Sequence, residues 1–144
     1  MWKSYINKIS KDHSFAEPAS EAEIFLLADE LSVDLPRKLL ELYSETNGVF
    51  DSFDCHLIWP VSRIIEDNMF FRNFDEYKEM YMSFDQLLFF SDNGCGDLFC
   101  NRILNGTIQT EDIYVWNQED DSRTWDVASL ETFIKGWITG EIST

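Results

Sequence analysis

The chain has 144 residues, with 27 acidic and 11 basic side chains and a net charge of −16. Hydrophobic residues make up 44% of it and aromatic residues 15%, which is too apolar for a disordered protein. The negative charge argues against direct binding to nucleic acids or anionic membranes, because phosphate groups would be repelled. It leaves two interpretations, namely solubility for an aromatic-rich protein or attraction to a basic partner.

The first half of the chain is predicted to be mainly helical, because its apolar residues recur at helical spacing. We expect helices at residues 2–9, from Ser20 to Leu31, from Pro36 to Asn47-Gly48, and from Ser62 onward with a break near residue 73. Residues 12–19 read as a loop, and residues 49–53 and 56–59 as short strands. The positions expected to face inward are Ile24, Leu27, Ala28, Leu31, Leu39, Leu40, Leu42, Tyr43, Ile64, Ile65, Met69 and Phe70.

The second half changes to strands joined by turns. Residues 87–90, 97–101 and 113–116 are predicted strands, and Asn105-Gly106 is a strong hairpin signal because its turn needs positive φ at both positions. Ser129 is expected to cap a last helix, with Leu130, Phe133, Ile134, Trp137 and Ile138 facing inward. The sequence therefore predicts an α+β fold, a mostly antiparallel meander covered by N-terminal helices and a C-terminal helix, in a single domain spanning residues 1–144.

Three possible chemical sites have simpler structural interpretations. The spacing of Cys55, Cys95 and Cys100 does not match the paired ligands of structural zinc, so we expect buried free thiols and no metal. A nucleophilic Cys95 assisted by His56 lacks any local signature. Gly94-Cys95-Gly96-Asp97 could cradle a phosphate, but no Lys or helix follows, which favours a sharp turn with Asp97 bonding the backbone. We expect no cofactor.

The segment from Glu111 to Asp126 is strongly acidic and carries one Arg. Its acids could form a solvated loop, a surface for a basic protein, or a metal or catalytic site such as a glycosidase carboxylate pair. Trp125 lies in a polar stretch and would be a plausible interface anchor if exposed, whereas Trp116 and Trp137 fit core positions. The odd number of cysteines and the lack of an apolar leader after Met1 indicate a reducing cytoplasm.

The chain resembles the SUKH superfamily, the Smi/Knr-like domain, from about residue 20 to residue 138. The resemblance rests on the order and spacing of five stretches rather than on any one of them. The family pattern often has a His before the Glu of the acidic tail, where this chain has Gln118, which further weakens a catalytic interpretation. The stretches are Leu35-Pro36 to Asn47-Gly48, Trp59-Pro60, residues 87–99 with Asp92-Asn93-Gly94-Cys95-Gly96-Asp97, Ile113-Tyr114-Val115-Trp116 with Glu119-Asp120-Asp121, and Ala128-Ser129-Leu130.

The resemblance implies a non-catalytic protein-binding domain. Members bind and neutralise toxin domains, often nucleases, delivered by competing bacteria, and some eukaryotic relatives instead act as scaffolds that regulate cell-wall glucan synthesis. It also implies that Trp59, Gly94 and Gly96 maintain the fold. We therefore expect a cytoplasmic immunity protein for a basic toxin domain, or alternatively a scaffold or regulator without a toxin partner. The residues hypothesised to contact the partner are Asp92, Asp97, Glu119, Asp120, Asp121, Trp125 and Asp126.

Overall fold

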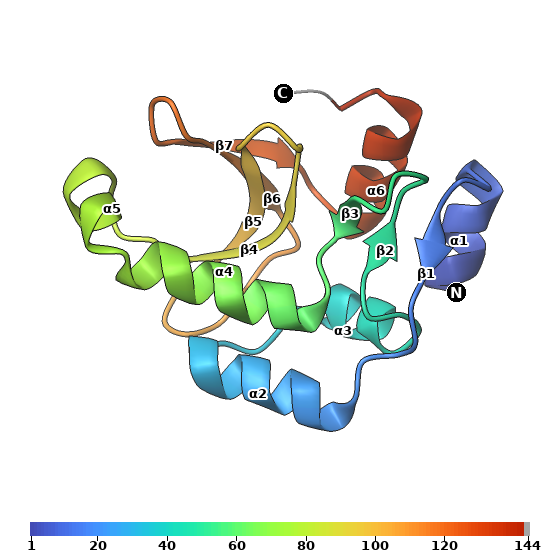
Figure 1. The fold of residues 1–144 in the computed structure, drawn as a ribbon, viewed down its shortest axis with the longest axis horizontal. Helices are drawn as coiled ribbons and strands as arrows, with labels where there is room; N and C mark the ends of the chain where they lie inside the picture. The colour runs from blue at the N-terminus through green and yellow to red at the C-terminus, as the bar shows by residue number, and fades with distance from the viewer. Residues whose placement is uncertain (143–144) are drawn as a thin grey trace.

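The computed structural model describes residues 1–142 and has an α+β architecture, as the sequence predicts (Figure 1). The prediction that residues 1–144 form one domain stays a prediction, and its last two residues lie outside the described part. In chain order the elements are α1 (Trp2–Ile9), β1 (Ser14–Phe15), α2 (Glu21–Leu31), α3 (Arg37–Tyr43), β2 (Val49–Phe50), β3 (His56–Ile58), α4 (Val61–Asn73), α5 (Asp75–Met80), β4 (Leu87–Asp92), β5 (Leu98–Arg102), β6 (Ile113–Asn117), β7 (Ser122–Val127) and α6 (Leu130–Thr139).

The strands form two antiparallel sheets. One has the order β1-β2-β3 and the other is the meander β4-β5-β6-β7. The two sheets are joined where β3 ends, because Trp59 N donates to Phe90 O at 2.9 Å and Ser91 Oγ donates to Leu57 O. This junction places the loop between β2 and β3 beside the end of β4.

Helices cover both faces of the meander. On one face, α4 crosses β4 (Figure 1), and Phe71 packs against Phe84, Phe89 and Trp116 with ring centroids 5.3–5.6 Å apart. On the other face, Phe133 of α6 lies 4.8 Å from Phe99 and 5.7 Å from Phe90, measured between ring centroids. Edge-to-face aromatic contacts of this kind favour a fixed packing beyond the burial of apolar area.

Local signals in the sequence place several element ends correctly. Ser20 and Glu23 form the predicted capping box at the start of α2, and the Ser129 side chain accepts from Thr132 N at the start of α6. Asn105 and Gly106 have φ of 53° and 77°, as the predicted hairpin turn requires, between the bridged residues 104 and 107. Phe74 separates α4 from α5, which confirms the predicted break.

The end of α3 was predicted wrongly. The helix stops at Tyr43, and Gly48, with φ of 105°, instead shapes the entry to β2. A Cβ at Gly48 would lie 3.0 Å from Ile58 O, so close packing against β3 also requires glycine there. Leu40, predicted to face inward, is 38% exposed, and β2 ends at Phe50, three residues earlier than expected.

The acidic segment after β6 was also assigned wrongly in part. Residues 122–127 form strand β7, which pairs antiparallel with β6 from Asn117 back to Ile113, and residues 14–15 form the unexpected strand β1. On α4 the inward position is Asn68 rather than Phe70, which is 50% exposed. The Asn68 amide donates to Phe89 O and accepts from Phe89 N, both at 2.9 Å, and so satisfies a backbone position on the outer edge of β4.

Candidate partner-binding surface

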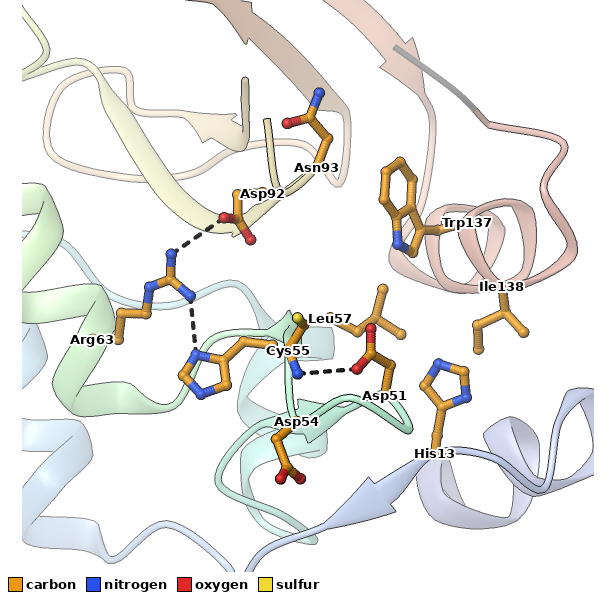
Figure 2. A pocket seen from close by; sticks show the side chains of 12 residues that line it. His13, Asp51, Asp54, Cys55, Leu57, Arg63, Asp92, Asn93, Trp137 and Ile138 are labelled. Atoms are coloured by element: carbon orange, nitrogen blue, oxygen red, sulfur yellow. Dashed lines mark hydrogen bonds and ion pairs between the residues drawn. The ribbon is translucent and has the colours of Figure 1, made fainter. Parts of the chain in front are cut away.

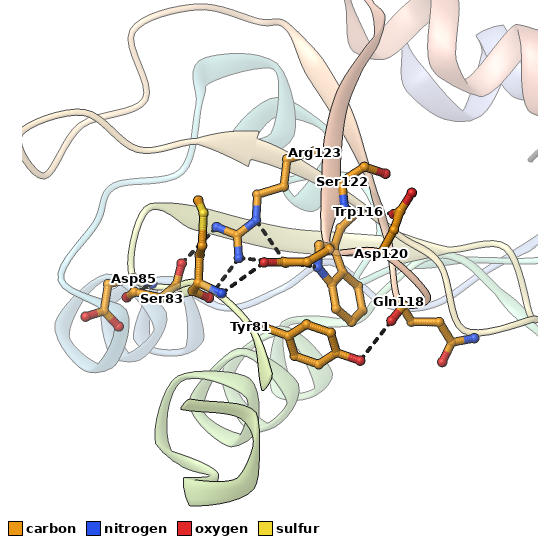
Figure 3. Close-up of polar contacts among 10 residues, drawn as sticks. Tyr81, Ser83, Asp85, Trp116, Gln118, Asp120, Ser122 and Arg123 are labelled. Atoms are coloured by element: carbon orange, nitrogen blue, oxygen red, sulfur yellow. Dashed lines mark hydrogen bonds and ion pairs between the residues drawn. The ribbon is translucent and has the colours of Figure 1, made fainter. Parts of the chain in front are cut away.

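The β4–β5 turn and the β6–β7 turn lie in contact at one end of the meander. Gln118 links them, because its Nε2 donates to Cys95 O at 2.9 Å and its backbone N donates to Asp97 Oδ1 at 3.4 Å. From the other side, Tyr81 Oη donates to Gln118 O at 2.9 Å (Figure 3). The two acidic segments hypothesised to contact a partner therefore share one surface near these turns.

The β4–β5 turn is closed by its own side chains. Asn93 Oδ1 accepts from Cys95 N at 2.7 Å and from Asp97 N at 3.2 Å, so these amides are already hydrogen bonded and are poorly suited to cradle a phosphate. Gly94 and Gly96 have φ of 79° and 104°, and a Cβ at Gly96 would lie 2.1 Å from Gln118 Nε2. Gly96 therefore allows the two turns to approach closely.

Asp121 is a structural residue rather than a free surface acid. Its carboxylate accepts from Trp116 Nε1 at 2.7 Å, from Met82 N at 2.9 Å and from Arg123 Nη2 at 3.0 Å. Figure 3 shows Arg123 reaching on to the 82–83 segment, where it donates to Met82 O and Ser83 O at 2.8 Å. Burial acts to raise the pKa of Asp121, but these hydrogen bonds outweigh burial and lower it.

Asp92 is likewise engaged within the fold. Its carboxylate accepts from Trp59 Nε1 and from Arg63 Nη2, both at 3.3 Å, while Arg63 Nε also donates to Asp67 at 3.0 Å. The guanidinium of Arg63 lies over the Trp59 ring, 4.2 Å from its centroid. Asp92 therefore neutralises a cation of the chain itself.

Glu119 and Asp120 are the acids of the β6–β7 turn that remain available to a partner. Both are exposed, and neither forms an ion pair with any described residue. Asp120 Oδ1 accepts from Ser122 N at 2.9 Å, and this backbone hydrogen bond lowers the pKa of Asp120. Asp97 lies beside them and is half-buried, so three carboxylates lie around the two turns.

Trp125 and Asp126 lie away from the turns, near the other end of β7. At roughly 3.3 Å per strand residue, Trp125 is about 13 Å from Asp121. Its side chain is 53% exposed, and Nε1 donates to Asp112 Oδ1 at 3.0 Å. Asp126 lies at a register shift of β7 against β6, between the paired residues Trp125 and Val127. Its Oδ2 is buried without a hydrogen-bond partner among the described residues, and burial raises its pKa.

A pocket of about 410 Å³ opens on the other side of the β4–β5 turn. Its walls come from the 51–55 loop, β3, α4, the β4–β5 turn and α6, with His13 at one edge (Figure 2). His56 Nδ1 is 3.0 Å from Arg63 Nη1, and burial together with Arg63 lowers the pKa of His56, so the imidazole is neutral at pH 7 and accepts this hydrogen bond. Sequence reasoning missed this pocket, whose lining residues come from distant segments.

The described residues assemble no recognisable chemical centre. Residues 1–142 contain no group of three or more His, Cys, Asp or Glu side chains positioned to hold a metal ion. All three cysteines are free, but the expectation that they are buried is wrong for Cys55 and Cys95, which are exposed. Only Cys100 is buried, and burial raises the pKa of its thiol to about 12, which makes it a poor nucleophile.

These features define a small α+β protein with exposed acids around two joined turns. The SUKH_6 family model, described as SMI1-KNR4 cell-wall, matches residues 21–134, and the chain belongs to this family. No curated protein matches the chain. Domains of the family are generally non-catalytic immunity or regulatory proteins, so membership supports a protein-interaction role. Across residues 1–142, every helix is too short or too polar to cross a membrane.

Proposed function

We propose that this protein is a cytoplasmic immunity protein that binds a basic toxin domain with nuclease activity and blocks that activity. The observation that carries the proposal is the pair of exposed acids at the β6–β7 turn, Glu119 and Asp120, in a chain of net charge −16 that belongs to an immunity and regulator family. Asp97 belongs to the same surface, and Trp125 is an exposed anchor farther along β7.

The mechanism follows from electrostatics. A nuclease holds its substrate through basic residues that contact phosphates, and an acidic protein that covers this cleft competes directly with nucleic acid. Unpaired surface carboxylates raise the association rate, while buried aromatic anchors lower the dissociation rate. Asp92 and Asp121 support this surface by holding the strand ends in place.

The test is co-expression of this protein with the toxin domain encoded by the neighbouring gene. We expect a 1:1 complex with the toxin activity lost. Glu119→Ser with Asp120→Ser should slow association several-fold at low salt and much less at high salt, because exposed charges are screened. The matched control is Asp75→Ser with Glu76→Ser, which removes two exposed acids from α5. Equal association rates for the two double variants would contradict the role of the turn.

A second candidate is a scaffold or regulator of cell-wall synthesis with no toxin partner. The cell-wall description of the matching family favours it. A pull-down from the source cells separates the two proposals, because an immunity protein recovers a toxin domain and loses it when the neighbouring gene is deleted. Recovery of an endogenous wall-synthesis protein, with no toxin domain bound, would support the second candidate instead.

A further inference from the structure

Arginines of this chain repeatedly lie over aromatic rings. The arrangement combines attraction between a cation and a π-face with hydrogen bonds made in the plane of the guanidinium. In two of the three cases an aspartate completes it. The pairs, with distances from the guanidinium carbon to the ring centroid, are Arg63 over Trp59 at 4.2 Å, Arg123 over Phe84 at 5.0 Å and Arg102 over Tyr114 at 5.6 Å.

The pocket beside the β4–β5 turn also contains an aromatic ring and aspartates, but no arginine of the described residues lies between them. Figure 2 shows Trp137 of α6 and Asp51 of the 51–55 loop on facing sides of the opening, with Asp54 at its lower rim and its carboxylate directed away from Trp137. Trp137 is held by an edge-to-face contact with Phe99, 5.5 Å between centroids. An indole facing the Asp51 carboxylate, with a second acid at the rim, is a favourable environment for a cation.

Asp51 is fixed in position and has capacity for a ligand. Its Oδ1 accepts from Phe53 N at 2.8 Å and from Cys55 N at 3.0 Å, which orders the loop. Its Oδ2 receives no hydrogen bond from the described residues. Asp54, which has φ of 62°, is exposed and forms no ion pair within residues 1–142.

We propose that this pocket binds the side chain of an arginine from the partner protein. The guanidinium stacks on Trp137 and donates to Asp51, and Asp54 adds negative charge at the rim. The volume of about 410 Å³ falls within the range of roughly 300–1,000 Å³ typical of ligand pockets. The identity of the arginine donor as a basic toxin domain rests on the proposed function, whereas the pocket chemistry does not. An arginine anchor in a preformed pocket is a common source of binding energy at protein interfaces.

Arg63 already lines the pocket, but its positive charge does not make the pocket a site for an anionic ligand. Arg63 uses Nε, Nη1 and Nη2 for Asp67, His56 and Asp92, and two carboxylates compensate its charge. An arginine also suits the pocket better than a lysine, because the planar guanidinium can stack and donate in-plane at once, whereas an ammonium is compact and strongly hydrated. The lining therefore carries a net negative charge toward an incoming guanidinium.

The proposal is tested without any toxin, by NMR titration of the full chain with N-acetyl-arginine amide. We expect the Trp137 indole signal to shift and saturate with a Kd on the order of 1 mM. The neutral isostere N-acetyl-citrulline amide should bind at least about fivefold more weakly, because it lacks the charge. Asp51→Asn with Asp54→Asn should weaken arginine binding by a similar factor. Asp29→Asn with Glu30→Gln, two exposed acids on α2, is the matched control and should bind like the unaltered protein.

The variants are chosen to preserve the fold. Asn at position 51 retains the Oδ1 acceptor for Phe53 N and Cys55 N, and Asn tolerates the positive φ at position 54. Trp137→Phe is a second variant and should weaken binding, because phenyl rings attract cations less than indole. Equal binding of citrulline amide, or full binding by the Asp51/Asp54 variant, overturns the pocket assignment.

The proposed function and the proposed arginine pocket can be contradicted independently of each other. Arginine amide binding together with no toxin complex overturns the immunity proposal and supports the pocket. A toxin complex formed with undiminished affinity by the Asp51/Asp54 variant, together with no binding of arginine amide, overturns the pocket and supports the immunity proposal.

Discussion

Two clusters of the same composition lie near the β4–β5 and β6–β7 turns. In one, Trp59 and Arg63 share Asp92; in the other, Trp116 and Arg123 share Asp121. Each joins an indole N–H, a guanidinium and one carboxylate. Their geometry differs, because the donor–acceptor distances to Asp92 are both 3.3 Å, whereas the shortest to Asp121 from the same two groups are 2.7 Å and 3.0 Å.

The difference comes from what covers each cluster. The 82–84 segment closes over Asp121 and Arg123, whose side chains are each 16% exposed, and its backbone bonds to both. Arg63 and Asp92 are 30% and 22% exposed and form a wall of the pocket. The same residue types therefore stabilise the fold where a segment covers them, and line an open pocket where none does.

Asp121→Ala should be the most destabilising change. It removes the acceptor of Trp116 Nε1 and Met82 N and leaves the Arg123 guanidinium without its carboxylate. We expect a loss of about 2–3 kcal/mol in the free energy of unfolding, below the range for fully buried pairs because part of the cluster is exposed. Urea denaturation measures the loss. Asp120→Ala, one residue earlier and exposed, should cost much less, because it removes only the hydrogen bond from Ser122 N. Equal effects of the two changes would remove the contrast.

The contribution of Asp121 should depend on pH. Its pKa is lowered below the ordinary value of 3.8, so its stabilisation is complete above that value and is lost as the pH falls through the lower folded-state pKa. The stability difference between the unaltered protein and Asp121→Asn should therefore be full at about pH 7 and smaller at about pH 2–3. Urea unfolding of both proteins across this range tests it, and a difference independent of pH would show that the charge of Asp121 is not involved.

Asp92→Ala should cost less, about 1–1.5 kcal/mol, because Arg63 keeps its ion pair with Asp67. Asp67→Ala is the matched change on the same arginine and should cost about 0.5 kcal/mol, as expected for a partly exposed i,i+4 pair. Denaturation curves compare both with Asp121→Ala. If Asp92→Ala were as damaging as Asp121→Ala, coverage by a neighbouring segment would not explain the difference between the clusters.

Asp126→Asn should have the smallest effect and the opposite sign. Burial raises the pKa of Asp126 and its buried Oδ2 lacks a partner among the described residues, so ionisation of this group costs stability. Removing the charge should raise stability by roughly 0.5 kcal/mol at neutral pH. Because the raised folded-state pKa means that the penalty disappears as the pH falls toward 3.8, the gain should disappear there too. A thermal melt at each pH measures it, and a loss of stability at neutral pH would contradict the assignment.

Much of the fold was predictable because local signals act over a few residues. The capping box of Ser20 and Glu23, the turn at Asn105-Gly106 and the cap at Ser129 all lie where the sequence predicts them. Strand β7 was missed because Ser122, Arg123 and Asp126 give it a polar pattern; its pairing with β6 rather than propensity makes it a strand. The inward position of Asn68 on α4 was missed for a similar reason. A polar side chain is buried there because the edge of β4 satisfies its amide, and this edge is brought to α4 only by the tertiary fold.

The sequence by itself determined the α+β class, the acidic character and the family, because composition, periodicity and motif order are properties of the chain. It also identified two acidic segments, residues 92–97 and 119–126, as candidate contact surfaces for a partner. Only the tertiary structure decided which acids are free. Asp92 bonds to Arg63, 29 residues away in the sequence, and Asp121 bonds to Met82, 39 residues away. The pocket is lined by segments as distant in the sequence as His13 and Trp137. Contacts at such separations depend on how the elements pack, and no local pattern in the chain encodes them.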